Sequence, residues 1–390
     1  MNWVVVLLLL LPMAFAAGWW CALRRGGSRL AARSDELSSD YFRGLNYLLN
    51  EEQDKAIEVF LRLAEYNRDA VETHLALGSL FRRRGEVDRA IRLHQHLVSR
   101  PGLSNDIKTL GLMELGDDYM RAGLLDRAES LFSDLVALQA HAPAALRQLI
   151  GIYQHERDWN KAIEQARLLE KATGESEAVL IAQFHCELAD QYRLQGHVEA
   201  ARDHLRQAFD NDANCIRALL ASAVMDASEQ KYAAAIKAYE QAISVDLAFV
   251  PQVLPPLQSA YAHQQAHVAA ARFYDGLLQR YQGISLVLAR VDLYRQQEGE
   301  AAAQAFLTRQ LQARPTVRGL MALIDASMER LDGEAMANFT ILNDLMRKLL
   351  EGQMMYRCTR CGFGAKAHHW QCPSCKSWST IRPIMGVANE

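Results

Sequence analysis

Four cysteines near the end of the chain have the spacing of a metal site. Two Cys-x-x-Cys pairs are separated by ten residues. Each pair predicts a tight turn that points two thiolates at one ion, and two such turns complete a tetrahedron. The spacing therefore predicts one bound metal ion, with these ligands: Cys358, Cys361, Cys372 and Cys375.

The residue after each pair bears on the geometry of the turn. Gly362 follows the first pair at a position where such a turn often needs positive φ. Lys376 occupies the corresponding position after the second pair, which predicts mild strain there. Four thiolates suit Zn²⁺ or a rubredoxin-like Fe. Because no flavin site, second metal site or glycine-rich nucleotide motif accompanies them, structural zinc is favoured and iron stays open.

The other candidate ligands are weaker. His368 and His369 lie in the ten-residue loop, where we expect a surface role rather than metal ligation. Cys21, Cys186 and Cys215 are isolated in the sequence and are expected to be inert. A disulfide among the four clustered cysteines is disfavoured if the domain is cytoplasmic.

The metal-binding tail, Met354 to Glu390, is short. Its 37 residues cannot bury a sufficient core, so metal binding must supply much of its folding free energy. Its large apolar side chains exceed what it can hide, and some should pack on the last repeats: Phe363, Trp370, Trp378, Ile381 and Ile384. Its basic residues mostly offset thiolate charge, so nucleic acid is not an expected partner.

The elements that precede the tail form an internal repeat. A small residue is followed by an aromatic three residues later, by an alanine nine residues after that, and by a bulky residue four further on. The alanines recur at spacings of 34 to 39 residues: Ala56, Ala90, Ala128, Ala162, Ala201, Ala235 and Ala270. This period resembles the tetratricopeptide repeat, a pair of antiparallel helices. The prediction is a mostly α-helical superhelical solenoid of about nine repeats over residues 35–350.

Packing explains the residue types of the repeat. Helices approach closely only where side chains are small, so we expect Gly or Ala on the first helix to face Ala on the second. Pro251, Pro255-Pro256 and Pro315 should mark helix boundaries. The groove expected along the first helices includes four candidate partner-binding residues, although an arginine run of this kind is more often a solvated helix end: Arg82, Arg83, Asp117 and Arg121. The constellation that clamps a terminal carboxylate in some such domains is absent from the first repeat.

The N-terminus predicts a membrane anchor. Trp3 to Leu23 is an uncharged run long enough to cross a bilayer as a helix. Ala14-Phe15-Ala16 looks like a signal-peptide cleavage site, but the arginines follow the run instead of preceding it. The positive-inside rule then places the N-terminus in the periplasm and the main body in the cytoplasm. We expect an anchor over residues 1–23, a basic linker over 24–34 and the metal domain over 354–390.

Composition limits the remaining classes of function. Half the residues are apolar and the net charge is −3, which describes a folded protein without a whole-chain preference for nucleic acid. The sequence has no phosphate-binding loop, zinc-protease motif or nucleophile elbow. We therefore predict a non-enzyme that binds partners along its repeats.

The order of these parts resembles a known family. One anchor, a tetratricopeptide array and a tail ending in Ile381-Arg382-Pro383 resemble the lipopolysaccharide assembly protein B (LapB) family of Gram-negative bacteria, over essentially the whole chain. The resemblance implies an inner-membrane adaptor. It would work with the membrane protease FtsH to degrade LpxC, the deacetylase that commits precursor to lipid A. It also implies contact with an inner-membrane protein that senses lipopolysaccharide, and a rubredoxin-like tail packed on the repeats.

Two other functions stay open at this point. A non-proteolytic scaffold would link the synthesis enzymes to the export machinery, and a rubredoxin-like electron carrier would hold redox-active iron. A homodimer is compatible with either. The sequence does not identify which groove residues bind which partner.

Overall fold

The computed structural model describes residues 42–386, apart from 45, 48, 49, 51, 67–70 and 329–332. The predicted anchor and basic linker lie outside these residues. Within the described part, no helix is both long enough and apolar enough to cross a membrane. The chain divides into two compact units, one up to Glu175 and one from Ser176, and each is described by itself.

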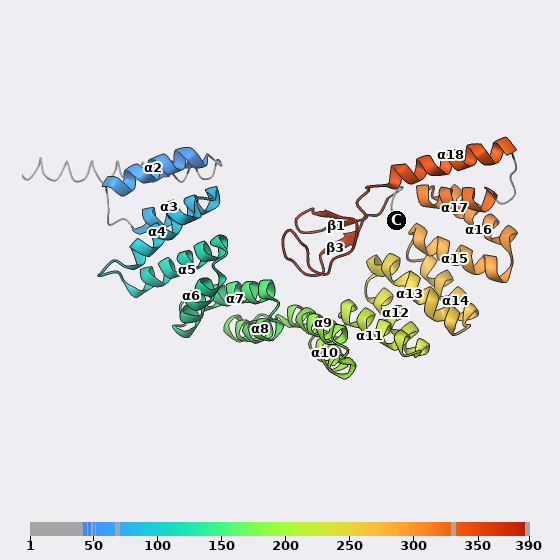
Figure 1. The fold of residues 1–390 in the computed structure, drawn as a ribbon, viewed down its shortest axis with the longest axis horizontal. Coiled ribbons are helices and arrows are strands. Elements are labelled where there is room, and N and C mark those ends of the chain that lie inside the picture. The colour runs from blue at the N-terminus through green and yellow to red at the C-terminus, as the bar shows by residue number, and fades with distance from the viewer. Residues whose placement is uncertain are drawn as a thin grey trace, which may run out of the picture. The chain divides into compact units, whose positions relative to one another are not determined.

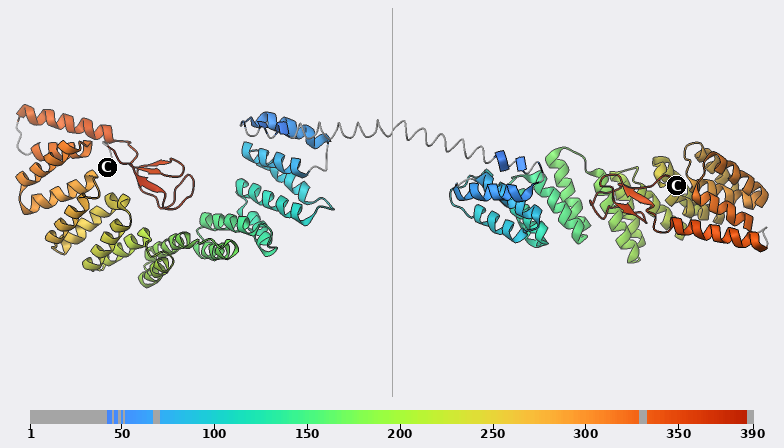
Figure 2. Two further views of the ribbon diagram at one scale, coloured as in Figure 1. Left: turned by 180° about the vertical axis from the view of Figure 1, so that it is seen from behind. Right: turned by 90° about the horizontal axis from the view of Figure 1, so that it is seen from above.

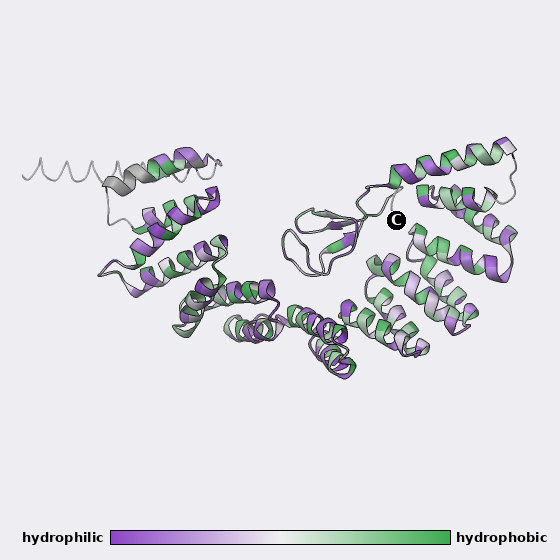
Figure 3. Cartoon of the chain, viewed as in Figure 1, coloured by the Kyte–Doolittle hydropathy of each residue, from purple (hydrophilic) through white to green (hydrophobic). Residues whose placement is uncertain are grey.

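The first unit is built of helices that pack in sequential pairs (Figure 1). They are α2 (Gln53–Tyr66), α3 (Val71–Arg84), α4 (Val87–Val98), α5 (Asn105–Ala122), α6 (Leu125–Ala137), α7 (Ala142–Glu156) and α8 (Trp159–Thr173). The helices from α3 to α8 carry both hydrophobic and hydrophilic residues (Figure 3), as expected where one face is buried and the other is solvated.

The second unit continues the pattern and ends in a small sheet (Figure 2). Its helices are α9 (Ala178–Leu194), α10 (Val198–Asn211), α11 (Ile216–Ser228), α12 (Tyr232–Val245), the 3₁₀ turn η1 (Leu247–Phe249), α13 (Val250–His263), α14 (His267–Leu278), α15 (Ile284–Gln297), α16 (Glu300–Ala313), α17 (Val317–Met328) and α18 (Gly333–Leu350).

The predicted repeat positions form the core. Every anchor alanine from Ala56 to Ala270 is 0–1% exposed, and the residue four positions after each one is at most 2% exposed. The two long spacings in the alanine series coincide with the 18-residue α5 and the 17-residue α9. The sequence prediction of a helical repeat array is confirmed for the described residues.

One detail of the packing differs from expectation. The closest side chain to each repeat glycine is the bulky residue sixteen positions later, not the anchor alanine. A Cβ placed on Gly78 would come within 2.2 Å of His94 Nε2, and a Cβ on Gly116 within 2.6 Å of the Phe132 ring. The small residue therefore makes room for a large side chain, because the ring and not the alanine crosses the helix interface.

The prolines also differ in part. Pro315 lies between α16 and α17 as predicted, and Pro251 lies in the first turn of α13. Pro255 and Pro256 do not mark a boundary but lie inside α13. Each interior proline removes a helix hydrogen bond. The helix persists because Val253, Leu254 and Leu257 around them are no more than 2% exposed, so packing outweighs local preference.

The tail after α18 is a three-stranded antiparallel sheet of order β2-β1-β3. The strands are β1 (Tyr356–Cys358), β2 (Gly364–Ala365) and β3 (Ile381–Pro383). In the register, Tyr356 pairs with Ala365 and Cys358 with Ile381. An isolated bridge between Gln371 and Trp378 closes the second half, so two short hairpin-like arms hold the cysteines. We call residues 356–383 the ribbon.

Candidate metal centre and the surface that the ribbon covers

The four predicted ligands come together. Their sulfur atoms all lie within 4.8 Å of one another. The Cys358 and Cys375 sulfurs are 3.7 Å apart, as are those of Cys361 and Cys372. A tetrahedral ion with metal–sulfur bonds of about 2.3 Å requires sulfurs separated by about 3.8 Å. The cluster therefore has the size of one four-coordinate ion.

The two arms hold their cysteines by the same backbone pattern. Gly362 N–H donates to the Cys358 carbonyl at 3.0 Å, and Lys376 N–H donates to the Cys372 carbonyl at 2.9 Å. Gly362 has φ 78° and Lys376 has φ 58°. Both are left-handed, which confirms the predicted positions. A lysine there costs about 1–2 kcal/mol more than glycine, since its Cβ crowds the backbone.

Hydrogen bonds and burial affect the thiols in opposite ways. Thr380 Oγ1 lies 3.3 Å from Cys358 Sγ, and this hydroxyl, with backbone N–H groups, lowers the pKa of Cys358 to about 6. Cys372 is fully buried, and burial raises its pKa to about 11. A cation at the centre would stabilise both thiolates. The arrangement suits an ion that supplies the missing positive charge.

Two tryptophans of the ribbon attach it to the repeats. Trp378 meets Phe184 of α9 edge to face, with centroids 6.0 Å apart. Trp370 stacks on Phe249 of η1 at 5.5 Å. Aromatic pairs of this kind add about 0.5–1.5 kcal/mol each to the burial of apolar area. The predicted packing of the tail on the repeats is confirmed.

The position of this packing differs from the prediction. The ribbon lies on α9, α11 and η1 rather than on the last repeats. These elements carry the matching aromatic and charged side chains, whereas the sequence order shows only that α18 precedes the ribbon. Arg382 of β3 additionally forms an ion pair with Asp246, which caps η1.

Arg217 of α11 is the charged centre of this contact. It is 6% exposed, and its guanidinium lies 5.9 Å from the Trp370 ring and 5.8 Å from the Trp378 ring. It also forms ion pairs of 2.8 Å with Glu187 and 2.9 Å with Asp190. The carboxylates neutralise a cation that the tryptophans shield from water, which is how a buried charge is tolerated.

The expectation for His368 is wrong, and that for Cys186 and Cys215 left out a contact between them. His368 is not a surface residue: it is half-buried among Tyr356, Trp370 and Phe249, and burial lowers its pKa to about 4. His369 is exposed as expected. Cys186 and Cys215 are not isolated from each other, because α9 and α11 bring their buried sulfurs to 3.8 Å. Cys21 lies outside the described residues.

Comparison with known proteins identifies both parts of the chain. Residues 356–383 match a family described as a rubredoxin metal-binding domain, and residues 43–96 and 113–177 match the tetratricopeptide repeat. Lipopolysaccharide assembly protein B of Escherichia coli K12 is 37% identical over 383 residues, which cover 98% of each chain. The chain belongs to the lipopolysaccharide assembly protein B family. The Haemophilus influenzae member is 32% identical over 98% of each chain.

In this family member, the four predicted groove residues also lie together, in the first unit. Arg82, Arg83, Asp117 and Arg121 line one depression with two residues that the sequence analysis missed, Met120 and Gln148. Gln148 lies two residues before the small-residue position of the fourth repeat, Ile150, where the repeat signal is weak. No sequence feature separates it from other polar helix residues.

Proposed function

We propose that this protein is an inner-membrane adaptor that restrains lipopolysaccharide synthesis by bringing the deacetylase LpxC to the protease FtsH. The observation that carries the proposal is similarity to lipopolysaccharide assembly protein B of E. coli over 98% of both chains. Similarity of this extent includes the array and the ribbon together, in the same order. The protease and deacetylase come from the family resemblance.

The described structure supports an adaptor in two ways. Helix pairs of a tetratricopeptide array present a continuous surface to protein partners. The ribbon is attached to that surface by Trp370 and Trp378, so the metal domain acts as a structural part of the array. We assign no enzymatic step to the chain.

The proposed metal ligands are Cys358, Cys361, Cys372 and Cys375, and the proposed metal is zinc with a structural role. The sulfur separations fit one tetrahedral ion, and Zn²⁺ suits four thiolates without redox chemistry. Iron fits the same geometry. Metal analysis and the absorption spectrum of protein isolated without added metal distinguish them, because a four-thiolate iron site is coloured and redox-active.

Residues 1–23 are the proposed anchor, with the N-terminus in the periplasm and the body in the cytoplasm. An anchored adaptor meets a membrane protease in two dimensions, at high effective concentration. The same membrane would hold the proposed lipopolysaccharide-sensing partner, with which the anchor would make contact.

The decisive experiment is the lifetime of LpxC after translation is stopped, in cells with and without this protein, at equal FtsH abundance. The adaptor role requires a longer LpxC lifetime on depletion. An unchanged lifetime contradicts it and supports the non-proteolytic scaffold, which would instead retain stable synthesis and export partners on purification.

A further inference from the structure

A polar depression lies on the first helices of three successive pairs in the first unit. It has a volume of about 570 Å³ and is lined by residues of α3, α5 and α7: Arg82, Arg83, Asp117, Met120, Arg121 and Gln148. The helices that line it are the ones on which a tetratricopeptide array carries its groove. All three belong to the same compact unit.

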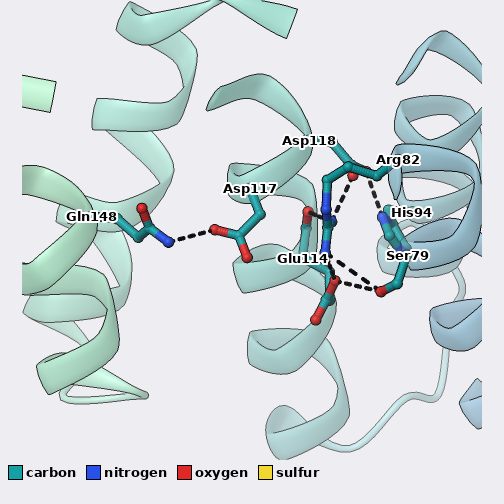
Figure 4. Close-up of polar contacts among 7 residues, drawn as sticks. All are labelled: Ser79, Arg82, His94, Glu114, Asp117, Asp118 and Gln148. Carbon is teal, nitrogen blue, oxygen red and sulfur yellow. Dashed lines mark hydrogen bonds and ion pairs between the residues drawn. The ribbon is translucent and has the colours of Figure 1, made fainter. Parts of the chain in front are cut away.

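The floor of the depression is a fixed ion-pair network. Arg82 contacts Glu114 and Asp118, at 2.7 Å each, and Asp118 also contacts the ring of the buried His94 (Figure 4). Glu114 in turn accepts a hydrogen bond from Ser79 at 2.9 Å. Two carboxylates already neutralise the Arg82 guanidinium. Arg82 therefore sets the shape of the floor and has no charge to offer a ligand.

Two arginines at the rim differ from Arg82 because no carboxylate of the described residues neutralises them. Arg83 and Arg121 are exposed, and neither forms an ion pair or hydrogen bond with any residue in the described part of the chain. Each lies five residues after the small residue of its repeat, so successive helix pairs present them from equivalent positions. A guanidinium binds a carboxylate with two parallel hydrogen bonds. The rim is thus ready to bind an acidic group.

The far side of the depression offers hydrogen-bond acceptors instead of cationic donors. Gln148 Nε2 donates to Asp117 Oδ1 at 2.9 Å, and Figure 4 shows this pair turned away from the Arg82 network. The hydrogen bond orients both side chains and leaves Gln148 Oε1 and Asp117 Oδ2 as acceptors. Backbone N–H groups of an extended peptide have no partner of their own and match such acceptors. Met120, which also lines the depression, is an adaptable apolar surface.

This combination favours a peptide over a phosphate-bearing ligand. A phosphate group offers acceptors only, so it would leave the Asp117 and Gln148 acceptors without donors. An extended peptide with an acidic side chain supplies a carboxylate for the arginines and N–H donors for Asp117 and Gln148. We infer that this depression binds an extended, acidic segment of a partner protein. The inference rests on the proposed function for the partners used in its test.

The test uses full-length protein in detergent on an array of overlapping twelve-residue segments from LpxC and the cytoplasmic part of FtsH. Each acidic segment is also printed with Asp replaced by Asn and Glu by Gln. We expect one or more acidic segments to bind, and the neutral versions to bind at least about tenfold more weakly, as for loss of a charge-assisted hydrogen-bond pair.

Variants locate the binding. The double variant Arg83→Gln/Arg121→Gln should weaken binding about tenfold or more, whereas the control Arg92→Gln/Arg167→Gln removes two exposed arginines from α4 and α8 and should leave it unchanged. Equal binding by both double variants, no bound segment, or full displacement by inorganic phosphate would each overturn the inference.

A degradation assay with purified FtsH and LpxC separates this inference from the proposed function. Stimulated degradation that the Arg83→Gln/Arg121→Gln variant keeps in full would leave the adaptor in place and contradict the groove assignment. Acidic-segment binding without any stimulated degradation would support the groove and contradict the proteolytic role.

Discussion

The first helices of the repeats meet two different surroundings. In the second unit, α11 holds Arg217 beneath two tryptophans of the ribbon, with carboxylates on its other side. In the first unit, α3 and α5 present Arg83 and Arg121 to solvent without ion pairs among the described residues. The same residue type is a structural part of the fold in one place and an open binding group in the other.

The surroundings of Arg217 show what a buried arginine on this array requires. Beneath the ribbon, aromatic rings cover the cation and Glu187 and Asp190 balance its charge. Covering Arg83 and Arg121 would likewise require an acidic partner, because a desolvated cation without compensation is costly. At Arg217 the array itself supplies the carboxylates, from α9, whereas at Arg83 and Arg121 the proposed partner segment has to bring them.

The largest expected effect comes from removing the metal. Cys361→Ser deletes one of four ligands, and metal binding of this type contributes about 10–16 kcal/mol to the folding of small zinc domains. We expect metal content to fall from about one ion per chain to near zero and the ribbon to become the first site of proteolysis. Ser374→Ala, which changes an exposed residue between Cys372 and Cys375 and removes no ligand, is the control. Unchanged proteolytic resistance in Cys361→Ser would contradict the structural role of the ion.

Arg217→Met should loosen the ribbon by a smaller amount. The change leaves Glu187 and Asp190 without their buried partner and removes the cation from Trp370 and Trp378, at a cost of about 2 kcal/mol after allowing for the partial exposure of the carboxylates. Hydrogen exchange of the ribbon amides should rise accordingly. The control Arg193→Met removes an exposed partner of the same Asp190, and equal exchange in both variants would show that Arg217 does not hold the ribbon.

Asp117→Asn should stabilise the first unit in a pH-dependent way. Burial raises the pKa of Asp117 from its usual 3.8 to about 6, so the folded state keeps a proton that the unfolded chain has lost. Stability therefore falls as pH rises from about 4 to about 6. Asparagine does not ionise, so the variant should have a free energy of unfolding about 1 kcal/mol higher than the original chain at pH 7–8, after discounting for partial exposure. Below pH 4, where Asp117 is protonated in both states, the two should be equally stable.

Urea unfolding of the Asp117→Asn variant, monitored by hydrogen exchange of α5 at pH 4 and at pH 8, tests this expectation. Asp134→Asn on α6 is an exposed control and should change stability by less than about 0.5 kcal/mol at either pH. A gain of the same size at pH 4 and pH 8 would show that ionisation of Asp117 is not its cause.

The smallest effect on stability is expected for Arg83, the exposed counterpart of Arg217. Arg83→Gln should change the stability of the first unit by no more than about 0.5 kcal/mol, because an exposed, unpaired side chain loses little on substitution. The measurement is the urea midpoint of the same exchange experiment. A loss as large as that expected for Arg217→Met would mean that Arg83 stabilises the fold and is not free for a partner.

Much of the fold was predictable because its rules are local. The alanine period gave the helix pairs, since every repeat buries the same positions against its neighbour. The exceptions are places where packing outweighed a local preference. Pro255 and Pro256 lie within α13 despite their effect on helices, and the repeat glycines accommodate a bulky side chain and not the anchor alanine.

The metal ligands could be predicted from the sequence, but the contacts between residues of different helices could not. The cysteine spacing predicted a cluster within one short segment, and the structure brings the four sulfurs together. The spacing did not reveal Gln148, or that Cys186 and Cys215 would meet. These residues come from different helices and carry no periodic signal.

The sequence by itself determined the repeat architecture, the four-cysteine cluster and the left-handed turns at Gly362 and Lys376. Only the tertiary structure decided that the ribbon covers Phe184, Arg217 and Phe249, and that Arg82 is neutralised while Arg83 is free. The physical reason is range. Contacts within a repeat follow from spacing along the chain, whereas contacts between the tail and distant helices depend on how successive pairs stack in space.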